Sequence, residues 1–168
     1  MKNNFTVNEI KKSVEYQWRN RQIKILLGIW VFISVAFSTV PIMCVIMDFE
    51  IIGMALLIWL VFVIMFGIIL GGFSLSYYFK NKYFVKNFMN FSCHEVMLDK
   101  VVTSLMTRGS VYYMVTIYDG NVKKEVYTNP YFSNYLFSKF LPEDYNNKKV
   151  VGLYDIQMDK FYIIKKIW

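Results

Sequence analysis

The sequence predicts a two-helix transmembrane hairpin joined to a small all-β domain. Between Lys24 and Lys80 the only charged residues are Asp48 and Glu50, in a chain that is 56% hydrophobic. These two acids divide the apolar run into segments 25–47 and 51–78, which as helices would be about 35 and 42 Å long. Because the hydrocarbon core of a bilayer is about 30 Å thick, each segment is long enough to cross it.

After residue 80 the composition changes to short β-branched and aromatic runs separated by turns. Fewer than ninety residues remain there, which is room for one small folded domain. We therefore predict three regions, namely an N-terminal arm over 1–24, the hairpin over 25–79 and a small β-domain over 80–168.

The basic residues lie outside the apolar segments and predict the topology. Residues 1–24 hold six Lys or Arg and two acids, and residues 80–168 hold thirteen and eight. The loop between the spans contains no Lys or Arg. By the positive-inside rule, both termini are expected in the cytoplasm of a multi-pass protein of a bacterial inner (plasma) membrane.

The N-terminal arm reads as a short amphipathic helix. Thr6 followed by Glu9 fits a capping box, and Ile10, Val14 and Trp18 recur at helical spacing. Two interpretations stay open: the helix lies on the inner leaflet with Trp18 among the headgroups, or it extends the first span into the cytoplasm.

The last region alternates apolar and polar residues as strands do. Expected strands cover 96–106, 111–118, 122–128, 150–154 and 160–167, and Asp119-Gly120 is a hairpin-turn signal. Asn129 and Pro130 predict the N-cap and first position of a short helix that runs through Tyr131 to Phe140. A portion from about Phe88 to the C-terminus is expected to fold independently.

This order of three strands, a helix and two strands resembles an OB-fold, a five-stranded barrel with a helix between its third and fourth strands. An SH3-like barrel is the main alternative. The whole chain also resembles the short NfeD-type membrane proteins and the hairpin-and-barrel effectors of bacterial cyclic-nucleotide defence. No functional residue of either family is carried over to this sequence.

One face of the predicted barrel combines aromatic and basic side chains. Stacking platforms and cations are the chemistry of nucleotide or single-strand binding, although cross-strand tyrosine pairs are also ordinary in sheets. The candidate ligand-binding residues are Arg108, Tyr112, Tyr118, Lys123 and Tyr127.

Small residues recur at four-residue spacing in the second span, and such spacing allows another helix to approach closely. The candidate helix-packing residues are Gly67, Gly71, Gly72 and Ser76. They form either the seam of a homo-oligomer or the contact with the first span of the same chain.

Nothing in the sequence indicates catalysis. His94 is the only histidine, and its neighbour Cys93 would point to the opposite face of a strand. The sequence does not supply the four ligands of a zinc site, and it contains no phosphate-binding or nucleophile-elbow motif. We expect no enzyme, cofactor or metal, and no binding of double-stranded nucleic acid.

The leading functional hypothesis is a non-enzymatic membrane protein whose small cytoplasmic barrel binds a protein partner in an accessory, regulatory or immunity role. The alternative is a ligand-gated effector, in which a nucleotide binds the barrel and the spans oligomerise to perturb the membrane.

Overall fold

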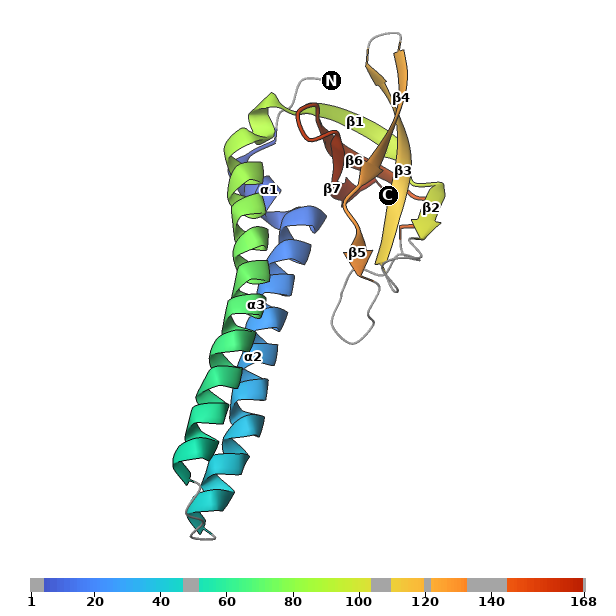
Figure 1. Cartoon of the computed structure of the whole chain (residues 1–168). Helices are drawn as coiled ribbons and strands as arrows, with labels where there is room; N and C mark the ends of the chain where they lie inside the picture. Colours follow the sequence, from blue (N-terminus) through green and yellow to red (C-terminus); the bar gives the residue numbers. More distant parts are fainter. Residues whose placement is uncertain (1–4, 47–51, 104–109, 120–121, 133–144, 168) are drawn as a thin grey trace. The chain divides into compact units, whose positions relative to one another are not determined.

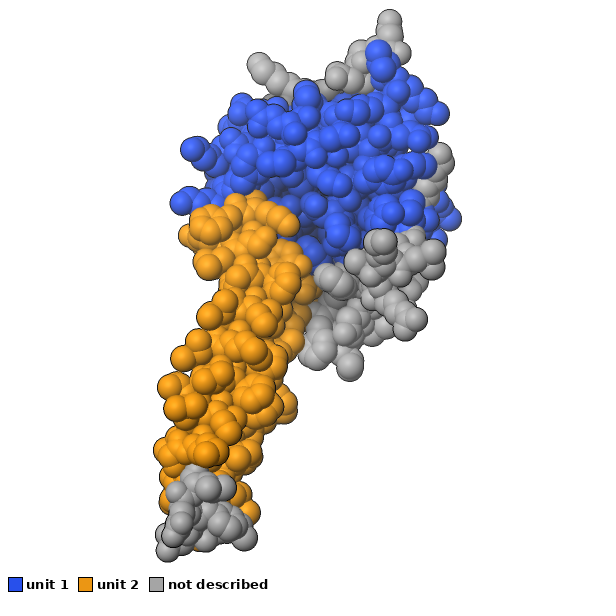
Figure 2. All heavy atoms as spheres, viewed as in Figure 1, with its two compact units in different colours: residues 1–19, 81–168 blue, residues 20–80 orange. Residues whose placement is uncertain are grey.

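The computed structural model of the chain describes residues 5–46, 52–103, 110–119, 122–132 and 145–167. These residues form two compact units (Figure 2). Unit 1 combines residues 1–19 with residues 81–168, and unit 2 comprises residues 20–80. The N-terminal arm thus belongs largely to the same unit as the sheet, so the segment from Phe88 onward is only part of unit 1.

Two long apolar helices are present as predicted. Helix α2 covers Val14–Ile46 and helix α3 covers Ile52–Asn87, and each is long and apolar enough to cross a membrane. A 3-10 turn, η1, follows at Phe88–Asn90.

Within unit 2 the helices run side by side (Figure 1) and are joined by two indole hydrogen bonds. Trp30 Nε1 donates to the Val63 carbonyl and Trp59 Nε1 to the Ser34 carbonyl, each at 3.2 Å. A hydrogen bond to a backbone carbonyl is valuable in an apolar environment, where water offers no substitute.

The arm begins with the predicted capping box but does not form one continuous helix. Thr6 caps helix α1 (Val7–Lys12), its Oγ1 accepting from the Glu9 amide and its own amide donating to Glu9 Oε2 at 2.8 Å. Ser13 then interrupts the helix, because its hydroxyl donates to the Ile10 carbonyl at 2.6 Å and accepts from the Tyr16 amide at 3.3 Å. Ser13 therefore ends α1 and starts α2.

Within the described residues, the sheet of unit 1 has seven strands, and six of them pair in the order β1-β6-β7-β4-β3-β2, with β5 paired to β3 (Figure 1). All described pairs are antiparallel except β4 with β7. The bounds are β1 Ser92–Met97, β2 Lys100–Thr103, β3 Ser110–Asp119, β4 Val122–Thr128, β5 Tyr131–Phe132, β6 Lys149–Asp155 and β7 Lys160–Lys166. Among the described pairings, β1 and β2 are the two ends of the path, and none closes it into a barrel.

Two expectations about the sheet were wrong. The single strand expected over 96–106 is divided at Leu98, whose amide donates to the Lys148 carbonyl at 3.0 Å and whose carbonyl accepts from the Asn147 amide at 2.8 Å. The helix expected from Tyr131 does not begin there, because Tyr131 and Phe132 pair with β3. The remainder of that expected helix lies outside the described residues.

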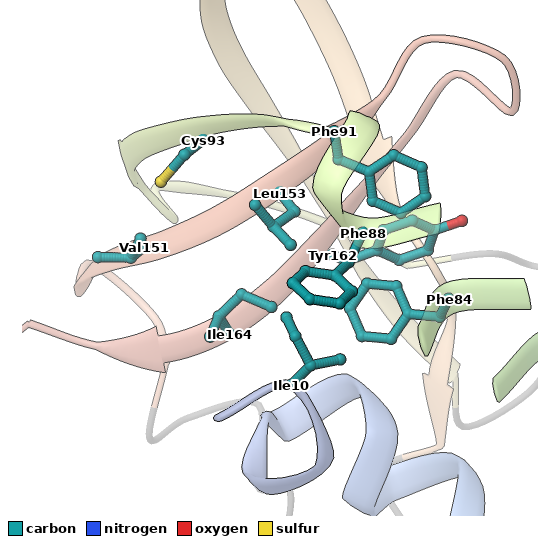
Figure 3. Packing of buried hydrophobic residues seen from close by; sticks show 9 residues of the cluster. All are labelled: Ile10, Phe84, Phe88, Phe91, Cys93, Val151, Leu153, Tyr162 and Ile164. Carbon is teal, nitrogen blue, oxygen red and sulfur yellow. The ribbon is translucent and has the colours of Figure 1, made fainter. Parts of the chain in front are cut away.

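One face of β1, β6 and β7 packs against α1 and the end of α3 (Figure 3). The buried side chains of this cluster are Ile10, Phe84, Phe88, Phe91, Cys93, Val151, Leu153, Tyr162 and Ile164. The alternate residues Val150, Tyr154, Phe161 and Ile163 are also buried, so β6 and β7 are covered on both faces.

Gly152 has a clear packing role in β6. A Cβ built at this position would lie 2.2 Å from Cζ of Phe161 and 2.7 Å from the carbonyl oxygen of Tyr162. Only glycine, which has no side chain, leaves room for the Phe161 ring to lie against β6 at this position.

Candidate functional site

Four of the five predicted ligand-binding residues lie on one surface of the β3–β4 hairpin. Tyr118 is opposite Lys123 in the register, and the Tyr112 and Tyr127 rings meet edge to face with centroids 5.7 Å apart. We call this surface, which consists of Tyr112, Tyr118, Lys123, Glu125 and Tyr127, the tyrosine face. Arg108 lies outside the described residues.

Tyr118, Lys123, Glu125 and Tyr127 of the tyrosine face are exposed and Tyr112 is half-buried, whereas the alternate residues of β3 are buried. Tyr118 is 65% and Tyr127 is 43% exposed, while Tyr113, Val115 and Ile117 are fully or almost fully buried. The alternation along β3 is therefore as the sequence predicted. As a result, tyrosine rings lie exposed on one face of the β3–β4 pair, while the opposite face of the same pair is part of the core.

The turn between β6 and β7 uses its carboxylates in hydrogen bonds within the chain. The buried Asp155 accepts hydrogen bonds from the amides of Gln157 and Met158 and from the Tyr83 hydroxyl. These contacts give Asp155 a turn-forming role.

At the other end of this turn, Asp159 pairs with Lys124. Asp159 Oδ1 lies 2.9 Å from Lys124 Nζ and accepts from the Tyr154 hydroxyl at 2.9 Å. The hydrogen bond from Lys124 lowers the pKa of Asp159. Both carboxylates of the turn are thus already engaged.

His94 and Cys93 do not form a catalytic pair. His94 Nε2 lies 2.8 Å from the Ser92 hydroxyl, whereas Cys93 is buried in the apolar cluster. Burial raises the pKa of the Cys93 thiol and so disfavours the nucleophilic thiolate. The described residues contain no group of three or more His, Cys, Asp or Glu side chains that could hold a metal ion.

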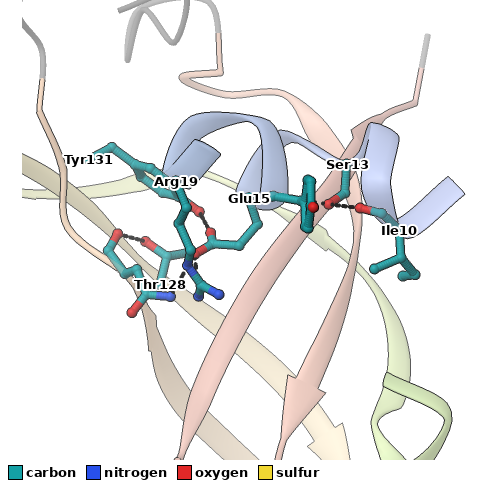
Figure 4. A network of polar contacts seen from close by, with 8 residues as sticks. Ile10, Ser13, Glu15, Arg19, Thr128 and Tyr131 are labelled. Carbon is teal, nitrogen blue, oxygen red and sulfur yellow. Dashed lines mark hydrogen bonds and ion pairs between the residues drawn. The ribbon is translucent and has the colours of Figure 1, made fainter. Parts of the chain in front are cut away.

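A buried polar network, which sequence reasoning missed, joins the arm to the sheet (Figure 4). The fully buried Glu15 pairs with Arg19 Nη2 at 2.6 Å and accepts hydrogen bonds from Asn129 Nδ2 at 2.9 Å and from the Tyr131 hydroxyl at 2.5 Å. Burial and the neighbouring carboxylate raise the pKa of Tyr131 well above its ordinary value, so it stays a neutral donor.

Aromatic rings complete the surroundings of this network. The Arg19 guanidinium carbon lies 5.3 Å from the Tyr162 ring centroid and 5.7 Å from that of Phe84. Trp18 packs edge-on against Tyr131 at 5.3 Å and is only 6% exposed. Helix α2 continues the first span back to Val14, as one of the two interpretations of the arm expected, but neither interpretation placed the apolar side chains of Ile10 and Trp18 in the protein core.

A second surface of unit 1 is a groove of about 840 Å³ with basic walls. We call it the basic groove. Its lining residues are Lys12, Val14, Glu95, Tyr145, Val151, Ile164, Lys165, Lys166 and Ile167. No local motif marks it in the sequence, because α1, α2, β1 and β6 each contribute one residue, β7 contributes three, and Tyr145 and Ile167 lie outside these elements.

The small residues of α3 separate into two kinds. A Cβ at Gly67 would lie 3.1 Å from Trp30 Nε1, so Gly67 is where α2 of the same chain packs. A Cβ at Gly71 or Gly72 would meet no atom within 4 Å, and Ser76 is exposed. The predicted packing stripe therefore serves the intrachain contact at one position and is open at the others.

Comparison of the chain with protein-family models, with curated protein sequences and with solved structures finds no match.

Proposed function

We propose that this chain is a non-enzymatic membrane protein whose unit 1 binds a protein partner through the tyrosine face. The observation that carries the proposal is a set of exposed tyrosines on an otherwise well-packed sheet. In the finer description that we propose, this sheet closes as a small OB-like or SH3-like barrel.

The membrane anchor is supported by the character of α2 and α3. In their most apolar windows only 11% and 6% of the residues are buried, whereas the core helix of a globular domain would be mostly buried. Phe32 and Ile68 are each at least 70% exposed on these helices. A hydrocarbon environment is the natural cover for such surfaces.

The composition of unit 1 supports a hairpin topology. Residues 1–19 and 81–168 share one core, which supports placing both on the same side of a membrane that residues 20–80 cross. Two crossings by α2 and α3 fit this arrangement. The lysines and arginines on both flanks favour the cytoplasm as that side, and a bacterial inner membrane as the location.

The chemistry of the tyrosine face fits a protein better than a nucleotide. Tyrosine is enriched at protein interfaces, where its ring buries a large area at low entropic cost. Lys123 and Glu125 bring opposite charges to the same face, and a phosphate would be repelled by the Glu125 carboxylate. The nucleotide-gated effector stays the alternative.

Site-specific photocrosslinking in native membranes tests the proposal. A benzophenone amino acid replaces Tyr118, and in a matched control it replaces Asn146, which is exposed but not part of the tyrosine face. We expect one discrete crosslinked band at position 118 that is absent at position 146. Tyr127→Ser should weaken this band, since it removes a neighbouring ring.

Three outcomes would contradict the proposal. A band at twice the mass of the chain would indicate self-association, and equal labelling at both positions would indicate random encounters. Stabilisation of the full-length protein by a nucleotide, abolished by Tyr112→Ala, would favour the effector.

A further inference from the structure

We propose that the basic groove is a second binding site, which takes a short acidic segment of a partner protein that also carries apolar side chains. This inference rests on the proposed protein-binding function but uses a different surface from the tyrosine face. The basis of the inference is a set of lysines that surround the apolar floor of the groove.

The floor of the groove continues the core of unit 1. Val151 and Ile164 belong to the apolar cluster, and Val151 lies toward one end of that cluster (Figure 3). The half-buried Val14 and Ile167 extend the floor. A ligand with apolar side chains would therefore remove additional hydrocarbon from water.

A register irregularity in β6 and β7 shapes the groove. Val151 pairs with Lys165, but Gly152 pairs with Ile163, so Ile164 is an extra residue on β7. Such a bulge redirects side chains at that point of a strand. As a result, β7 contributes one buried apolar residue and two consecutive lysines to the lining of the groove.

The walls are mainly basic. Among the described residues that line the groove, Lys12, Lys165 and Lys166 are basic, and the single acid, Glu95, pairs with Lys149 at 3.0 Å. Nearby Glu9 does not line the groove, and its carboxylate is held by the Thr6 amide and hydroxyl at 2.8 and 2.9 Å. Charge complementarity therefore favours an acidic occupant.

The spread of the lysines favours a peptide over a single phosphate group. Lys12 comes from the end of α1, while Lys165 and Lys166 come from β7, and the Lys166 ammonium lies 4.2 Å from the centroid of the Tyr145 ring. Cations spaced around an apolar floor match carboxylates spaced along a chain. A phosphate site would instead need several donors that converge on one point.

The test uses the full-length protein in nanodiscs of neutral phosphatidylcholine. The probe is a fluorescein-labelled peptide of four Glu-Leu repeats, with Lys-Leu and Glu-Ser peptides as comparisons, and binding is read by fluorescence anisotropy. We expect the Glu-Leu peptide to bind most tightly, and its affinity to fall as salt is raised from about 0.05 to 0.3 M, as screening increases.

A charge-matched pair of variants locates the binding. The variant K12Q/K165Q/K166Q should weaken binding at least ten-fold. The control K11Q/K82Q/K86Q removes three exposed lysines that belong neither to the groove nor to the tyrosine face and should change the affinity less than two-fold. Both variants should unfold at the same temperature as the unmodified protein, which shows that the groove variant is folded.

Equal loss of binding in the two variants, or equal binding of the Lys-Leu peptide, would overturn the proposal. So would flotation with vesicles containing phosphatidylglycerol that depends on the groove lysines, if the Glu-Leu peptide does not bind. Failure of the groove test with a discrete crosslink at position 118 would leave the proposed function in place.

Discussion

The Tyr131 hydroxyl donates a hydrogen bond to Glu15 Oε2 at 2.5 Å and so joins two residues that are 116 positions apart in the chain. Asn129 binds the same carboxylate, and Arg19 neutralises it. One buried acid on the arm is thus satisfied by the segment that follows β4. Removing a single partner from such a network leaves the others buried without their counterpart.

Substitutions of Glu15 and Tyr131 should lower the free energy of unfolding by different amounts. Glu15→Leu removes the carboxylate that pairs with the buried Arg19 and should lower the free energy of unfolding by about 3–5 kcal/mol. Tyr131→Phe removes one hydrogen bond to a charged group and should cost about 1.5–3 kcal/mol. Urea unfolding of the full-length protein in nanodiscs, followed by near-UV circular dichroism, measures both, and the E15L/Y131F double variant gives their coupling. Additive effects would contradict a shared network.

Gly67 and Gly71 of α3 should respond differently to substitution by isoleucine. Gly67→Ile should displace Trp30 and weaken the pairing of α2 with α3, because the new side chain meets the indole ring. Gly71→Ile enters open space and should leave that pairing intact. Tryptophan fluorescence in membranes reports the first effect. Chemical crosslinking tests whether the Gly71 position contacts a second copy, and unchanged crosslinking would exclude a homo-oligomer seam there.

Cys93 should react slowly with thiol reagents. Burial raises the pKa of its thiol, so at pH 8 a smaller fraction is thiolate than for an exposed cysteine. Because the shift is upward, the labelling rate should continue to rise at pH values where an exposed thiol has already levelled off. Maleimide labelling of the C44A variant, with and without urea, measures this. Fast labelling of the folded protein at pH 8 would contradict the burial.

Gly152→Ala should destabilise unit 1. The added methyl group would overlap the Phe161 ring and the Tyr162 carbonyl, and overpacking of this kind costs about 1–3 kcal/mol. Gly72→Ala is the matched control, since its Cβ meets no atom within 4 Å. Thermal unfolding of both variants provides the comparison, and equal melting temperatures would show that β6 adapts.

The proposed topology predicts the outcome of reporter fusions. A reporter that is active only outside the cytoplasm should be silent after Trp168 and active when inserted between Asp48 and Glu50, because the flanking lysines and arginines hold both termini inside. Activity at the C-terminus would contradict the cytoplasmic location of unit 1.

The sequence predicted the elements with strong local signals. The apolar segments, the Thr6–Glu9 capping box and the alternation along β3 and β4 are all present in the structure. Each of these follows from neighbouring residues, through hydropathy, a three-residue spacing or a period of two.

The errors involve contacts between distant segments. Asn129-Pro130 is a local helix-start signal, but pairing with β3 and the hydrogen bond to Glu15 place Tyr131 in a strand. Trp18 and Arg19 suit a membrane surface by composition, yet both are buried within unit 1. The basic groove also depends on the pairing of β6 with β7. Periodicity cannot reveal such long-range contacts.

The shared core of the arm and β7 also constrains the order of events during synthesis. Ile10 leaves the ribosome before both long helices, and Ile164 leaves it after strands β1 to β6, yet the two belong to one cluster. The arm therefore stays without its packing partners on β7 while the intervening chain is made, and unit 1 is completed only after β7 has left the ribosome. A chain truncated before β7 would leave Ile10 and Phe84 uncovered, and we expect quality-control proteases to remove such products.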